Sequence, residues 1–133
     1  MTAAPDAVGR LAGQIAAALE AADLAAYRDL LDPAVTWGPP EQPRSGCRSR
    51  DQVLAWCARG REAGTRASVT ETAVFGDKIL VGLLVTGRSD AVGEPHGEER
   101  RWQVLTVRDG KVTEIVGFED REQAMARGGL GRD

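Results

Sequence analysis

Residues 100–120 read RRWQVLTVRDGKVTEIVGFED, and this stretch decides the fold of the chain. Apolar residues occupy both of its halves, and Asp109-Gly110 lies between them. An Asp-Gly pair favours the left-handed backbone that a two-residue β-turn requires. The stretch therefore predicts two long antiparallel strands joined at positions 109 and 110.

The two faces of this hairpin differ in character. Successive side chains of a strand point to opposite faces, so Gln103 shares a face with Arg101, Leu105 and Val107, whereas Trp102 lies on the other face. On the second strand the same rule groups Glu119 with Lys111, Thr113, Ile115 and Gly117. We expect these two groups to form the concave side of a curved sheet. Gln103 and Glu119 would then be unusual polar groups in an apolar hollow.

Composition favours an ordinary globular protein. The chain has 133 residues, 42% apolar and 28% charged, with a net charge of −3, which fits one domain over residues 1–133. No basic block offers a footprint for phosphates, so nucleic acid is an unexpected partner. The first helix pattern is interrupted by polar residues, so we expect no signal peptide and no membrane span, and a cytoplasmic location.

The cysteines do not point to a metal site. Cys47 and Cys57 are the two cysteines of a chain with one histidine. A thiol-rich zinc site needs about four such ligands. We therefore expect two reduced thiols, no bound metal and no cofactor.

The first half of the chain predicts helices. Apolar residues at helical spacing indicate an amphipathic helix from about Asp6 to Ala21. A second helix follows, with Asp23 as its N-cap and Asp32-Pro33 at its end. After a brief strand, Val35–Trp37, a third helix begins at Ser49, which with Gln52 resembles a capping box. Its expected buried side consists of Val53, Leu54, Trp56 and Cys57.

The second half predicts strands. From Ala67 the period changes to two, and this places Val69 and Glu71 on one face. Gly76-Asp77 turns the chain into Ile79–Thr86, an apolar run that indicates a strand covered on both faces. We expect the helices on one face and a second subunit on the other. A polar connection, Gly87–Gly97, precedes the central hairpin, and a short helix follows it from Asp120 to about Ala126.

Three segments resemble the nuclear transport factor 2-like superfamily, in particular its SnoaL-like branch of polyketide cyclase and ketosteroid isomerase relatives. They are DLAAYRDLLDPAVTW, CRSRDQVLAW and VLTVRDGKVTEIVGFEDREQAM. The resemblance implies an α+β fold, a cone-shaped curved antiparallel sheet wrapped around N-terminal helices. It also implies an apolar pocket at one end and a homodimer formed through the outer sheet face. An exposed Trp102 on that face would favour the dimer.

The resemblance carries over few catalytic residues. In the steroid isomerases, the catalytic base corresponds to Gly38 of this chain. Their oxyanion-hole tyrosine falls near Ile15, and the partner aspartate falls at Gln103. The acid of the cyclases falls at Gly117. The Arg-x-Asp pair of the epoxide hydrolases falls in the aliphatic strand ILVGLLVT. The known reactions of the fold are therefore not supported by these positions.

Two polar residues remain candidates for catalysis. Burial in an apolar cone would raise the pKa of Glu119 and make it an acid or base, whereas at the strand end it would be solvated. Gln103 could orient a ligand carbonyl or hydroxyl, or bond a neighbouring backbone group. Arg101 could hold a ligand carboxylate or pair with a glutamate.

The expected pocket is otherwise apolar. Besides Glu119 and Gln103, we expect its lining to comprise Ile15, Tyr27, Trp37, Trp56, Arg101, Leu105 and Ile115. The ligand would be a small apolar molecule. The first functional hypothesis is a cofactor-free isomerase, cyclase or hydrolase acting on an apolar carbonyl compound, with Glu119 as acid or base and Gln103 as polarising donor. The alternative is a non-catalytic ligand-binding or dimerisation module.

Overall fold

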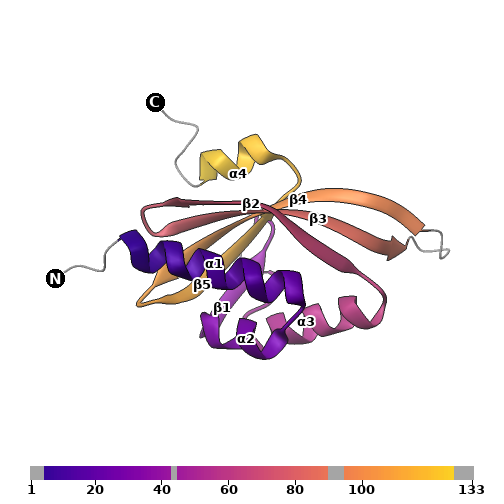
Figure 1. Cartoon of the computed structure of the whole chain (residues 1–133), viewed down its shortest axis with the longest axis horizontal. Helices are drawn as coiled ribbons and strands as arrows, with labels where there is room; N and C mark the ends of the chain where they lie inside the picture. The colour runs from indigo at the N-terminus through magenta and orange to yellow at the C-terminus, as the bar shows by residue number, and fades with distance from the viewer. Residues whose placement is uncertain (1–4, 43–44, 90–94, 128–133) are drawn as a thin grey trace.

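Helices cover both sides of a single curved sheet. The computed structural model describes residues 5–42, 45–89 and 95–127. Figure 1 shows three helices on one side of the sheet and the fourth on the other. In chain order the elements are α1 (Pro5–Ala21), α2 (Leu24–Leu30), β1 (Leu31–Gly38), α3 (Arg50–Glu62), β2 (Arg66–Phe75), β3 (Lys78–Ser89), β4 (Pro95–Arg108), β5 (Lys111–Phe118) and α4 (Arg121–Arg127).

The strands are ordered β1-β5-β4-β3-β2. Strands β2 to β5 form the expected antiparallel meander. Strand β1 joins at the edge and runs parallel to β5, with Trp37 opposite Ile115. The predicted fold class is confirmed, and the sheet is mixed where the prediction had it wholly antiparallel. Parallel pairing between distant segments carries no local turn signal, which is why β1 was not placed.

Local signals fixed the helix starts and the central turn. Asp109 and Gly110 adopt φ values of +51° and +77°, so the predicted Asp-Gly hairpin is confirmed. The Asp23 carboxylate accepts from the Ala26 backbone N–H at 3.1 Å, and the Ser49 hydroxyl accepts from that of Gln52 at 3.2 Å. Both residues are the predicted N-caps.

Two predicted boundaries were too short or too long. The strand expected over Val35–Trp37 begins at Leu31, immediately after α2. Of the connection expected over Gly87–Gly97, both ends belong to strands, because β3 reaches Ser89 and β4 starts at Pro95. Its centre, 90–94, lies outside the described residues. Within the described ranges, no helix is long and apolar enough to cross a lipid bilayer.

Two β-bulges change which residues share a face. On β5, Val112 pairs with Val107 and Glu114 with Thr106, so Thr113 is the extra residue. Val112 is therefore in the core, and the predicted inward position of Thr113 is wrong. On β2, Val69 pairs with Leu83 and Glu71 pairs with Gly82. The prediction that Val69 and Glu71 share a face is therefore also wrong.

The outer face of the sheet has an apolar core of its own beneath α4. This core contains Leu80, Val104, Val116, Phe118 and Ala124, with Ala73, Phe75, Trp102 and Met125 at its edge. The chain itself thus covers part of the face where we expected a second subunit. A homodimer through the remaining surface stays a prediction.

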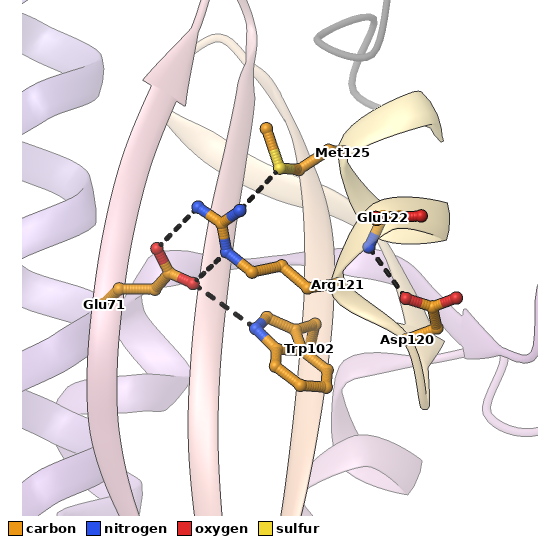
Figure 2. Close-up of polar contacts among 6 residues, drawn as sticks. All are labelled: Glu71, Trp102, Asp120, Arg121, Glu122 and Met125. Atoms are coloured by element: carbon orange, nitrogen blue, oxygen red, sulfur yellow. Dashed lines mark hydrogen bonds and ion pairs between the residues drawn. The ribbon is translucent and has the colours of Figure 1, made fainter.

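A polar cluster fastens α4 to this face (Figure 2). Arg121 donates to both carboxylate oxygens of Glu71, at 2.7 and 3.1 Å. The indole of Trp102 donates to the same carboxylate at 3.4 Å. Trp102 is therefore half-buried within its own chain.

Candidate functional site: the concave face around Gln103

The inner part of the concave face is closed by packing. Four residues expected to line a pocket lie here, and each is at most 3% exposed: Ile15, Tyr27, Leu105 and Ile115. They come from α1, α2, β4 and β5 and belong to one core cluster. Burial raises the pKa of the Tyr27 phenol far above its usual range, with a smaller contribution from Cys57. The structure therefore brings these residues together as core, and their expected place on a pocket wall is wrong.

The outer part of the same face is less closely packed. Several apolar residues here are only half-buried although they contact the core: Trp37, Leu54, Cys57, Val69 and Val85. They come from β1, α3, β2 and β3. Helix α3 packs mainly against β1 and α2. We call this region the open end of the concave face.

Gln103 lies at the boundary between the closed part and the open end. It is 8% exposed and is the one buried polar side chain among the residues whose burial the structure describes. Its Oε1 atom is buried and has no hydrogen-bond partner. The predicted inward orientation of Gln103 is confirmed, whereas Oε1 accepts no hydrogen bond from the backbone or any other described group. An unpaired buried oxygen costs about 1–3 kcal/mol.

Two tryptophans stand at the open end. The Trp37 and Trp56 rings meet edge to face, with centroids 6.4 Å apart, an arrangement that aromatic pairs prefer. A Cβ atom added to Gly117 would lie 3.7 Å from Trp37 Nε1. Trp56 is 55% exposed, and the Arg59 guanidinium carbon lies 5.7 Å from the centre of its ring. The predicted burial of Trp56 on α3 is therefore wrong.

The charged residues of the face pair with one another. Arg101 donates to Glu119 at 2.8 Å and to Glu99 at 2.9 Å. The Glu119 side chain is 83% exposed, and position 119 lies one residue beyond the end of β5. Of the two alternatives considered for Glu119, the structure shows the solvated position at the strand end. Of the two roles considered for Arg101, the structure shows the pairing with glutamates.

The thiols are shielded. Burial, with a smaller contribution from the nearby Cys47, raises the pKa of Cys57 to about 11. Burial also raises the pKa of Cys47, against a smaller opposing effect of Arg59. Both are free cysteines. In the ranges covered by the structure, no group of three histidine, cysteine, aspartate or glutamate side chains could hold a metal ion.

A groove lies away from this face, between α1 and α2. It has a volume of about 500 Å³ and is lined by Gln14, Ala17, Ala18, Ala21, Asp23, Ala26, Asp29 and Leu30. The sequence reasoning missed it. The run of alanines was the available signal, because small side chains on facing helices leave space between them.

The functional neighbours of Gln103 were only partly foreseen. Strand alternation placed Gln103, Arg101 and Gly117 on one face. It could not place Trp37 beside Gly117, because that contact depends on the parallel pairing of β1 with β5. Arg59 was missed because nothing in the sequence showed that Trp56 would be exposed.

Structures of similar fold span most of the chain. A proposed polyketide cyclase from Xanthomonas campestris pv. campestris aligns with a TM-score of 0.70 at 16% identity, covering 93% of this chain and 98% of the other. A proposed ketosteroid isomerase from Kribbella flavida aligns with a TM-score of 0.69 at 18% identity, covering 85% and 77%. A protein of ketosteroid isomerase-like fold from Catenulispora acidiphila, in complex with trimethylamine, aligns with a TM-score of 0.64 at 18% identity, covering 90% and 92%. At these identities the similarity shows the fold alone.

Sequence comparison gives the family. Among curated proteins, no sequence matches this chain. The model of the SnoaL-like domain matches residues 12–115, which is most of the chain and includes β1 to β4 and most of β5. The chain therefore belongs to the SnoaL-like domain family, within the nuclear transport factor 2-like fold.

Proposed function

We propose that this protein binds a small apolar molecule at the open end of its concave face, with Gln103 as the polar contact. The observation that carries the proposal is the buried Gln103 Oε1 without a partner. Buried polar atoms in folded proteins are almost always paired. A ligand that donates a hydrogen bond would supply the missing partner, and the half-buried apolar residues around it would contact the rest of the ligand.

The site suits binding better than acid–base catalysis. A general acid or base must reach the reacting atoms in a suitable protonation state. Two carboxylates, Glu99 and Glu119, both bind Arg101, which lies two residues from Gln103 on β4. Gly117 stands where the resemblance places the acid of the cyclases. A binding role, unlike acid–base catalysis, does not require a free carboxylate at this site.

A cofactor-free isomerase, cyclase or hydrolase acting on an apolar carbonyl compound is the second candidate. The observation that favours it is the exposed position of Glu119, beside Arg101 on the same face as Gln103. Exposed ion pairs are worth at most about 1 kcal/mol. A substrate carboxylate or carbonyl at Arg101 could release Glu119 to act as an acid or base. The two free cysteines of the chain fit a reducing compartment. For either candidate function, we therefore place the protein in the cytoplasm.

The test is a titration with 2-naphthamide, an apolar compound whose N–H can donate to Gln103 Oε1, followed by the ¹H–¹⁵N signals of the Trp37 indole and the Gln103 side-chain amide. Trp37→Phe and Gln103→Met identify these signals by their loss. We expect saturable shifts of both. A Glu119→Gln variant should keep the affinity if the protein only binds. A lower affinity would instead favour a direct role for Glu119.

The matched control is a substitution in the groove between α1 and α2, away from the proposed site. Ala17→Leu partly fills the groove between α1 and α2 and leaves the concave face intact. Binding should survive this substitution. Loss of binding in Ala17→Leu, or no saturable shift at Trp37 and Gln103 in the unmodified protein, would refute the proposed site.

A further inference from the structure

Gly117 leaves a space between two polar side chains. It lies directly opposite Gln103 in the pairing of β4 with β5. A Cβ atom at position 117 would have Trp37 Nε1 at 3.7 Å. Apart from the chain neighbours, no other heavy atom of the described residues lies within 4 Å of that point. A β-carbon at this position would therefore be in van der Waals contact with the Trp37 indole alone among the described residues beyond its chain neighbours.

The two side chains offer complementary hydrogen-bonding groups. An indole N–H is a donor only, whereas an amide side chain has both an acceptor and two donors. The Gln103 oxygen is shielded from solvent and unpaired. Because the oxygen has no hydrogen-bond partner, a turn of the Gln103 side chain toward Gly117 would break no hydrogen bond of this oxygen.

We propose that the space over Gly117 receives the polar end of the ligand, and that this end presents an acceptor and a donor side by side, as in a primary amide or a lactam. This inference rests on the proposed binding function. The ligand's carbonyl oxygen accepts from the Trp37 indole, and its N–H donates to Gln103 Oε1. A ketone would pair with the indole but leave Oε1 unpaired. A site with an unpaired buried group discriminates against such a ligand.

The experiment compares 2-naphthamide with 2-acetonaphthone, which share the ring system and the carbonyl and differ in NH₂ against CH₃. Dissociation constants come from the same titration of the Trp37 indole signal. We expect the amide to bind roughly tenfold more tightly, the value of one buried hydrogen bond. Gln103→Met should abolish this preference by weakening the binding of the amide.

A second variant tests the space itself. Gly117 has no positive φ and lies in a strand, so Gly117→Val is compatible with the backbone. Its side chain fills the space, and the affinity for the amide should fall by about tenfold or more. The control is Gly13→Ala on α1, where an added Cβ meets nothing within 4 Å; its affinities should be unchanged.

The outcomes separate the inference from the proposed function. Equal affinities for amide and ketone, or a preference that persists in Gln103→Met, would overturn the inference while the concave face remains a binding site. Failure of both compounds to bind would overturn the inference and the proposed function together. If Gly117→Val does not fold, as circular dichroism would show, the Gln103→Met result still decides.

Discussion

Replacing Gln103 with methionine should make the free protein more stable. The two side chains are unbranched and of similar shape, so the swap keeps the volume at a position that is 8% exposed. It removes an oxygen that is buried without a partner, an arrangement that costs about 1–3 kcal/mol. Imperfect repacking after a volume-conserving substitution costs less than about 1.5 kcal/mol. The expected net gain is about 1 kcal/mol in the free energy of unfolding.

Urea and thermal unfolding, both measured by circular dichroism, would detect this change. A gain of about 1 kcal/mol should raise the melting temperature of a domain of this size by about 3–5 °C. The slope of the unfolding free energy against urea concentration should stay unchanged. The control is Gln14→Met on the exposed side of α1, which should stay within about 0.5 kcal/mol. A Gln103→Met protein that is less stable by 1 kcal/mol or more would refute the reasoning, because it would show that the amide is satisfied within the fold.

Three further predictions concern the scaffold. Asp23→Ala removes the N-cap of α2 and should lower stability by about 1 kcal/mol in thermal unfolding; an unchanged melting temperature would contradict the cap. Hydrogen bonding from Arg121 lowers the pKa of Glu71 below its ordinary value of 4.5. The contact therefore stabilises the protein fully at pH values above 4.5, and this stabilisation is lost as the pH falls through the lowered pKa. Glu71→Gln should therefore be less stable than the unmodified protein at pH 7 in urea unfolding, and this difference should shrink as the pH is lowered; a difference that does not change with pH would contradict this. Because the pKa of Cys57 is raised to about 11, iodoacetamide at pH 8 should alkylate Cys47 before Cys57 in peptide mass spectra, and the opposite order would contradict the shielding of Cys57.

The elements with strong local signals could be predicted from the sequence. Asp109-Gly110 fixed the central hairpin, because few residues adopt positive φ at both turn positions. Asp23 and Ser49 fixed the starts of two helices through bonds that span three residues. The long-range parallel pairing of β1 has no such signal, so the sheet was expected to be wholly antiparallel.

The candidate site shows the same limit. Alternation along β4 placed Gln103 inward correctly, because the pairing from Trp102 to Thr106 is regular. It failed for Thr113, where a bulge adds a residue, and it could not decide between the two alternatives for Glu119, which follows the last residue of β5. Bulges and strand ends depend on tertiary packing, and a period of two in the sequence does not reveal them.

The most direct test is the set of intermolecular nuclear Overhauser effects between bound 2-naphthamide and the protein. Binding at the open end should give contacts from the naphthalene protons to the Trp37 indole and to the side-chain amide of Gln103. Contacts confined to the methyl groups of Ala17 and Ala26, in the groove between α1 and α2, would contradict a ligand site on the concave face.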